Sequence, residues 1–229
     1  MLSSLGYWLS GASFLLLAVL LISIWRVRSG STALVTAILI TSLYCLAIAA
    51  DVRPATGVSV PQFFLETGRN LVWLTFLSIL FGGAVGQYKL WLVRYGGLFF
   101  ALGVTLIGLW QWYFVDAALL TGKMQYLLSI GTVFISLAAL VQIEQVFRNA
   151  RGSQQRGLKF LCVATGCMFA YDLAMYSNAI STGQISILLW DVRGYVLLMC
   201  ATLIGLASAR GMESAPGIFV SRKVVFYAT

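Results

Sequence analysis

The sequence predicts an all-α integral membrane protein that folds as a bundle of seven transmembrane helices. The composition is 60% hydrophobic and 10% charged, with a mean hydropathy of +0.92, which lies outside the range of soluble globular proteins. The chain also offers one apolar run after another, each near the ~20 residues that a helix needs to cross the bilayer core. The basic residues cluster on alternate connections between these runs, as they do in a polytopic membrane protein.

The first run is a retained helix and not a cleavable signal peptide, because no positive charge precedes it and its apolar stretch is too long. The third run begins after Pro61, and the fourth ends in the interfacial aromatic residues Trp110 and Trp112. Basic residues follow the first, fifth and seventh runs. We expect the seven spans at Leu5–Trp25, Thr32–Ala50, Phe63–Gly83, Tyr95–Phe114, Met124–Phe147, Leu158–Ala179 and Ile185–Ala209. Together they make one transmembrane domain over residues 1–209.

The formal net charge of +8 encodes membrane topology and does not indicate nucleic-acid binding. One set of connections holds most of the basic residues, while the opposite set holds only Arg53 and Lys123. By the positive-inside rule, the N-terminus is outside and the C-terminus is cytoplasmic. The basic residues of the cytoplasmic set are Arg26, Arg28, Lys89, Arg94, Arg148, Arg151, Arg156, Lys159, Arg210, Arg222 and Lys223.

Residues 210–229 have the pattern of a cytoplasmic connector followed by the start of a further helix. Pro216 and Gly217 interrupt the helix, Arg222 and Lys223 supply a basic flank, and a short apolar run begins at Val224. One interpretation is a longer protein cut before an eighth helix. The other is a short amphipathic tail that lies on the membrane surface.

Several site chemistries are excluded by residues that the sequence lacks. It contains no histidine, and no lysine lies in the middle of the seventh span, so haem ligation by paired histidines and a retinal Schiff base on that helix are both excluded. The four cysteines have no CxxC spacing, which argues against a metal site or a disulfide framework. We therefore expect no metal, no cofactor and no enzymatic activity of this chain itself.

Ionisable residues inside spans are costly unless they are paired or hydrated, so each of them is a candidate functional residue. With the predicted topology, five of them lie within roughly 12 Å of the outer surface at 1.5 Å of helix rise per residue. They form a candidate ligand or signal site of Glu66, Arg69, Asp172, Asp191 and Arg193, with Asn70, Tyr176 and Asn178 as supporting polar residues. Three acids against two arginines leave one negative charge. The group is either an interhelical network that fixes packing or a polar pocket that opens outward.

Two stretches of the sequence resemble a known family. They are Tyr171-Asp172-Leu173-Ala174-Met175-Tyr176-Ser177-Asn178-Ala179, followed by Leu189-Trp190-Asp191-Val192-Arg193-Gly194, and Phe219-Val220-Ser221-Arg222-Lys223-Val224-Val225-Phe226. In this order and spacing they resemble the membrane region of the sensor histidine kinases of the PEP-CTERM/exosortase system. The chain departs from that pattern at Val196-Leu197-Leu198-Met199, where relatives have Asn-Ala and a proline, and at Tyr227, where they tend to have histidine.

The resemblance implies the sensory and anchoring membrane domain of a bacterial two-component sensor histidine kinase. Its expected location is the bacterial inner membrane, and its expected partners are the lipid bilayer, cytoplasmic kinase domains of the same polypeptide and a second copy in a homodimer. The catalytic function of the family is not carried over, because the chain has neither a phosphoacceptor histidine nor a nucleotide-binding domain. A small transporter, channel or accessory subunit is the alternative, since intramembrane acids are common there too.

Overall fold

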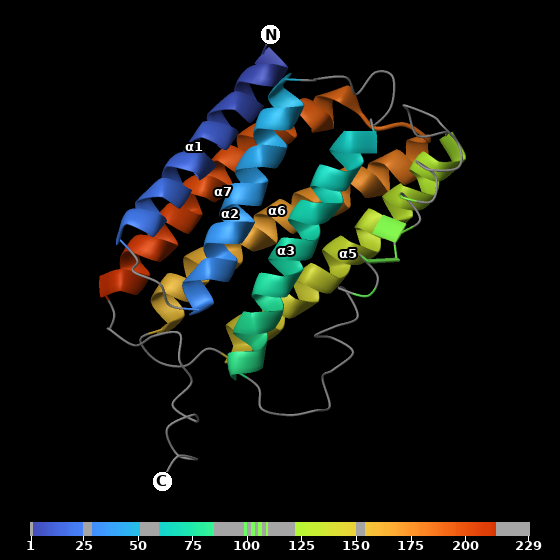
Figure 1. Cartoon of the computed structure of the whole chain (residues 1–229). Helices are drawn as coiled ribbons and strands as arrows, with labels where there is room; N and C mark the ends of the chain where they lie inside the picture. The colour runs from blue at the N-terminus through green and yellow to red at the C-terminus, as the bar shows by residue number, and fades with distance from the viewer. Residues whose placement is uncertain are drawn as a thin grey trace.

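The described residues of the computed structural model form six α-helices and no other regular elements (Figure 1). They cover residues 2–24, 29–50, 60–84, 122–149 and 154–213, with a few single positions between residues 99 and 109. The helices are α1 (Leu2–Ile24), α2 (Ser29–Ala50), α3 (Val60–Ala84), α5 (Gly122–Asn149), α6 (Gln154–Thr182) and α7 (Ile187–Glu213).

The prediction of a seven-helix bundle is wrong, because six helices are present in the part of the chain that the structure describes. The predicted fourth span, residues 95–114, lies outside the described residues apart from single positions. The proposed start of a further helix after residue 213 also lies outside them. The other six predicted spans each coincide with a helix, although the helix limits differ from the predicted ones by a few residues.

Five of the helices are long and apolar enough to cross a membrane, so the chain is a multi-pass membrane protein. Their candidate spans are Ser4–Ser23, Thr32–Ala50, Gln125–Arg148, Leu158–Thr182 and Ile187–Ala209. The helix α3 is not among them, because Glu66, Arg69 and Asn70 lower the hydropathy of its first half. It packs between α2 and α5.

The helices close into a ring, in the order α1, α2, α3, α5, α6, α7 and back to α1. In Figure 1, α1, α3, α5 and α7 run down the view, whereas α2 and α6 run up. The starts of α3 and α7 therefore lie at the same end of the bundle as the end of α6. Any side chains near those three ends are brought to one depth.

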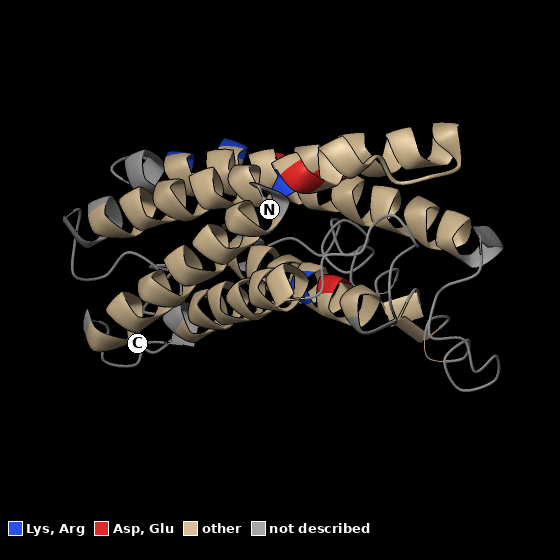
Figure 2. Cartoon of the chain, turned by 90° about the horizontal axis from the view of Figure 1, so that it is seen from above, with Lys and Arg blue, Asp and Glu red and all other residues tan. Residues whose placement is uncertain are grey.

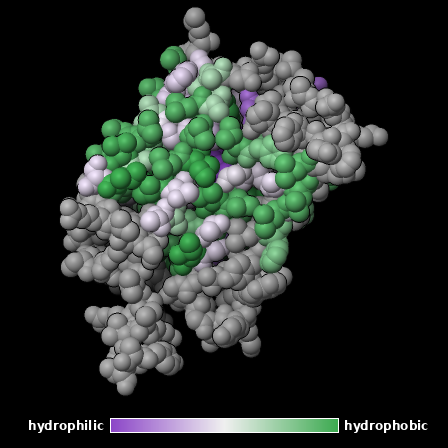
Figure 3. All heavy atoms as spheres, viewed as in Figure 1, coloured by the Kyte–Doolittle hydropathy of each residue, from purple (hydrophilic) through white to green (hydrophobic). Residues whose placement is uncertain are grey.

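The outer surface of the ring is apolar, as expected for helices that face lipid. Large side chains such as Leu16, Phe134 and Leu188 are more than half exposed. Figure 3 shows apolar side chains gathered over α1 and α2 on the face that it presents, and Figure 2 shows that charged residues occupy few turns of the described helices. Lipid tails are as apolar as these side chains, so moving such side chains from lipid into a helix–helix contact contributes little to holding the helices together.

A tight turn joins α6 to α7 and fixes these helices as an antiparallel pair. Gly183 follows the last residue of α6 and has a φ of 73°, the left-handed conformation that glycine adopts readily at a helix C-terminus. The Thr182 hydroxyl lies 2.9 Å from the carbonyl oxygens of both Asn178 and Gln184, which share its one proton. The Trp190 amide donates to the Ser186 carbonyl in the first turn of α7 (3.0 Å).

The helices α1 and α7 approach each other closely where Gly6 faces Gly194. A Cβ atom added at Gly194 would lie 2.8 Å from the backbone nitrogen of Tyr7 and 2.9 Å from the backbone carbon of Gly6. These are backbone atoms, so no side-chain rotation relieves the clash. Small residues at a crossing let two membrane helices pack backbone to backbone.

We expect Gly194→Ala to separate α1 from α7 and to lower the free energy of unfolding by about 1–3 kcal/mol, the usual cost of overpacking. The matched control is Gly205→Ala on the same helix, where an added Cβ would meet only Leu17 Cδ1 at 3.7 Å. Unfolding in a mixed-detergent titration measures both variants. Equal midpoints for the two alanine variants would contradict the close packing at Gly194.

Candidate functional site

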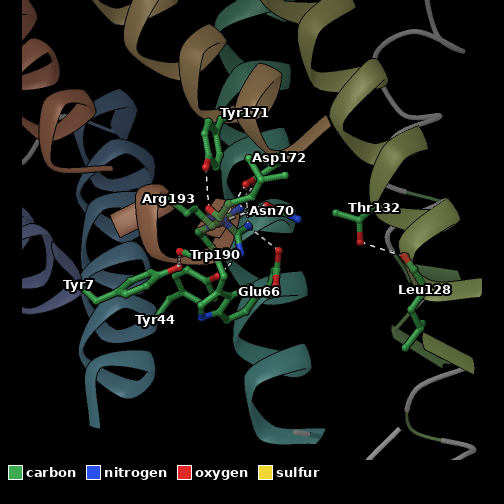
Figure 4. A network of polar contacts seen from close by, with 12 residues as sticks. Tyr7, Tyr44, Glu66, Asn70, Leu128, Thr132, Tyr171, Asp172, Trp190 and Arg193 are labelled. Atoms are coloured by element: carbon green, nitrogen blue, oxygen red, sulfur yellow. Dashed lines mark hydrogen bonds and ion pairs between the residues drawn. The ribbon is translucent and has the colours of Figure 1, made fainter. Parts of the chain in front are cut away.

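The interior of the ring contains four buried charged side chains that form one continuous network, here called the quartet: Glu66 and Arg69 of α3, Asp172 of α6 and Arg193 of α7. Each is at most 4% exposed. Two carboxylates face two guanidinium groups, so the quartet carries no net charge. Figure 4 shows Glu66, Asp172 and Arg193 converging from α3, α6 and α7.

Asp172 lies at the centre of the quartet and binds both arginines. Its Oδ2 accepts a hydrogen bond and ion pair from Arg69 Nη2. Its Oδ1 accepts from Arg193 Nε at 2.8 Å and lies 2.7 Å from Arg193 Nη2. A carboxylate held between two guanidinium groups makes charge-assisted hydrogen bonds on both oxygens. Asp172 thereby connects α6 to α3 and to α7.

Arg193 uses all three of its guanidinium nitrogens. Besides Asp172, it binds Glu66 Oε1 through Nη2 at 2.5 Å and the Tyr44 hydroxyl through Nη1 at 2.5 Å. The fixed fork of an arginine suits such multiple contacts, which a lysine cannot reproduce. One side chain of α7 is therefore bound to α2, α3 and α6 together.

Arg69 and Glu66 are supported by neutral polar neighbours. Asn70 Oδ1 accepts from Arg69 Nη2 at 2.9 Å and from Arg69 Nε at 3.2 Å. The Tyr176 hydroxyl hydrogen-bonds to Glu66. Arg69 Nη1 is buried and has no hydrogen-bond partner among the described residues.

Aromatic rings surround the two arginines and exclude lipid from them. The guanidinium carbon of Arg69 lies 4.7 Å from the centre of the Tyr44 ring, and that of Arg193 lies 5.4 Å from the same ring. Arg193 also lies 5.5 Å from the Trp190 ring and 5.8 Å from the Tyr176 ring. Cation–π attraction is strongest in such desolvated surroundings, at about 2 kcal/mol or more.

The turn of α7 that carries Arg193 is fixed from both sides by hydrogen bonds to its backbone. The Tyr7 hydroxyl of α1 donates to the Trp190 carbonyl at 2.6 Å. The Tyr171 hydroxyl of α6 donates to the Leu189 carbonyl, also at 2.6 Å. These bonds hold the depth and rotation of α7, and so they position the Arg193 guanidinium.

The structure brings together four of the five residues expected at the site and leaves out Asp191. That residue is partly exposed and joins no ion pair among the described residues. Of the supporting residues, Asn70 and Tyr176 contact the quartet, whereas Asn178 is exposed on α6. The expected excess of one negative charge is wrong for the assembled site, because two acids balance two arginines.

Sequence reasoning did not identify Tyr7 and Tyr44 as part of the site. Tyr44 is fully buried in the second half of α2, and Tyr7 is fully buried in the second turn of α1. A tyrosine within an apolar span carries a hydroxyl that needs a partner, which is the one signal that the sequence offered. The partner itself depends on how the helices pack.

A small pocket reaches the quartet at Glu66. It lies between the start of α3, the first turns of α5 and the end of α6, and its lining includes Glu66, Thr67, Ser129, Thr132 and Tyr176. The apolar lining residues are Phe63, Leu128 and Ile185. Figure 4 shows Thr132 and Leu128 on α5, across from Glu66. Among the described residues, no cluster of side chains is suited to hold a metal ion.

Comparison with known proteins gives no relative for this chain. No protein-family model matches it, and no curated protein or solved structure matches it either.

We expect Arg193→Gln to lower the free energy of unfolding by about 3–5 kcal/mol, because removing one partner leaves buried carboxylates uncompensated. The control is Arg148→Gln, whose pair with Glu144 is 3.3 Å long and exposed. An exposed pair contributes about 0–1 kcal/mol. Detergent unfolding titrations of the two variants measure the difference, and similar losses would contradict a cohesive role of the quartet.

The position of Asp191 outside the quartet leads to a separate expectation. Asp191→Asn should change the free energy of unfolding by no more than about 0.5 kcal/mol, as a substitution away from buried networks does. Asp172→Asn should destabilise the bundle strongly, because it removes the charge that both arginines face. The same titration applied to both variants tests this, and a large loss for Asp191→Asn would place that residue back in the network.

Proposed function

We propose that this chain is the sensory and anchoring membrane domain of a bacterial two-component sensor histidine kinase, located in the inner membrane. In this proposal a periplasmic or intramembrane cue shifts the helices of the bundle. The shift passes through α7 to kinase domains of the same polypeptide, which act as a homodimer. The chain itself carries out no chemistry.

The observation that carries this proposal is the way in which the quartet connects the helices. Residues of the stretches that resemble the kinase family, Asp172 and Arg193 among them, are the ones that bind α6 and α7 to α3. Tyr171 and Trp190 of the same stretches fix the backbone of α7. The family-like residues thus form the mechanical connection that a sensor of this kind needs.

The quartet also has a second way of satisfying its charges. Glu66 and Arg69 are spaced i,i+3 on α3, so they can pair with each other on one helix face. Asp172 and Arg193 then remain paired across the α6–α7 turn. Both arrangements keep every charge neutralised, but only the observed one holds α3 against α6 and α7. Such a bistable packing element is what a cue can bias.

A transporter, channel or accessory subunit remains the second candidate. The observation in its favour is the pocket beside Glu66, because intramembrane acids near a polar cavity also mark ion pathways.

The decisive experiment is to translate the source reading frame beyond Thr229. The sensor proposal requires a continuing helix, a dimerisation segment with a phosphoacceptor histidine and an ATP-binding domain. A stop codon directly after Thr229 would overturn the proposal and favour the transporter class.

In the full-length protein reconstituted in liposomes, we expect the quartet to control the rate of autophosphorylation. Tyr44→Phe removes one hydrogen bond to Arg193 and should keep the fold, while Arg193→Gln breaks the network. Each should change the basal rate, Arg193→Gln by about 5-fold or more, since allosteric couplings are typically about 5- to 150-fold. Arg148→Gln is the control with an unchanged rate. Identical rates for all three variants would refute the coupling.

A further inference from the structure

The pocket beside Glu66 has the size and the lining of a site for water. The volume within it that a water-sized occupant can use is about 20 Å³. A cavity needs roughly 10–15 Å³ by this measure to hold one water molecule, together with two to four polar partners. The pocket therefore has room for one water molecule or a similarly small species.

The polar side chains that line the pocket belong to Glu66, Thr67, Gln125, Ser129, Thr132 and Tyr176, and three of them present hydrogen-bond acceptors to it. The Ser129 hydroxyl donates its proton to the Gln125 carbonyl (2.8 Å), and the Thr132 hydroxyl donates its proton to the Leu128 carbonyl (3.0 Å). The oxygens of both hydroxyls are thus left as acceptors. A carboxylate has about four acceptor positions, and Arg193 and Tyr176 occupy two of those on Glu66. An occupant held between Glu66, Ser129 and Thr132 therefore has to bring donors.

The charge of the quartet determines whether a small cation or a neutral water molecule suits the pocket better. A bare cation in the pocket would leave one uncompensated positive charge in a low-dielectric interior, because Glu66 is already neutralised by Arg193. Water brings two donors and no charge. Buried polar groups that lack a direct partner are commonly satisfied by such internal water.

The pocket also lies on the side of the quartet where α5 passes. Ser129, Thr132 and Ser136 form a buried polar face on α5 with the spacing of successive helical turns. The contacts described above attach the other five helices to the network, whereas Ser129 and Thr132 face Glu66 across the pocket. A bridging water would join α5 to the same network.

We propose that the pocket is a water site and that water held between Glu66, Ser129 and Thr132 connects α5 to the quartet. Glu66 is then the one quartet member that water reaches, and it is the point at which a small polar species can compete for the network. This inference goes beyond the proposed function and does not depend on it, since water in the pocket is measured without any kinase readout.

Hydroxyl-radical labelling of the wild-type protein in lipid nanodiscs tests the proposal, because the radicals form from water and mark the side chains next to it. Leu128 lines the pocket, and Leu34 and Leu161 are its matched controls. All three are 5% exposed, and each lies within about two turns of the start of its helix. We expect labelling of Leu128 to be several-fold faster than labelling of Leu34 or Leu161.

Among the buried tyrosines, Tyr176 should likewise be labelled faster than Tyr7 and Tyr44, which do not line the pocket. The double variant Ser129→Ala/Thr132→Val keeps the shape of the lining but removes both acceptors, so labelling of Leu128 should fall to the level of Leu34. Thr36→Val is its control, because Thr36 makes the same type of backbone hydrogen bond (2.8 Å) on an exposed face of α2.

Two results would overturn the proposal. One is labelling of Leu128 at the rate of the two control leucines in the wild-type protein. The other is fast labelling of Leu128 that persists in the double variant, which would show that water enters without the proposed acceptors.

Discussion

The fold depends on one carboxylate, Asp172, held between the guanidinium groups of Arg69 and Arg193. In a bilayer the apolar outer faces of the helices gain little by leaving lipid, so association has to come from close packing and from polar contacts between helices. Removing four charges from water is costly, and the cost is offset only because every charge meets an opposite one with good hydrogen-bond geometry. The helices of the ring are therefore arranged so that each buried charge meets an opposite one.

The ionic contacts that join α3, α6 and α7 lie near one end of the bundle. The quartet lies near the starts of α3 and α7, and the rest of the inward face of α7 is formed by small or apolar residues such as Leu197, Cys200 and Ile204. The crossing of α1 and α7 at Gly194 is one residue away from Arg193. A rearrangement of the quartet therefore acts on α7 beside a closely packed crossing. The displacement would be transmitted along a rigid helix to its far end.

The sequence was sufficient to place the quartet but not to select its members completely. Depth along a helix follows from counting residues, so the convergence of Glu66, Arg69, Asp172 and Arg193 was predictable from alternating helix directions. Asp191 shares that depth but lies two residues from Arg193, and residues two apart on a helix do not share a face. Tyr44 was not predictable, because its role depends on the rotation of α2 against α3 and α7. Six helices are present in the part of the chain that the structure describes, and the predicted fourth span, residues 95–114, lies outside that part apart from single positions.

The arrangement of charges explains how such a network can be both cohesive and able to switch. Its members alternate in sign along a chain of ion pairs, from Glu66 to Arg193, to Asp172 and to Arg69, and both ends of this chain lie on α3. Moving α3 away from α6 and α7 divides this path into two neutral pairs and leaves no net charge in either part. Separating the helices therefore costs only the ion pairs that α3 makes with α6 and α7. Losing any single member of the quartet instead leaves an unpaired charge in the membrane. Glu66 and Arg69 each pair with one opposite charge, and of the two only Glu66 borders the polar pocket, where a small polar species can reach it.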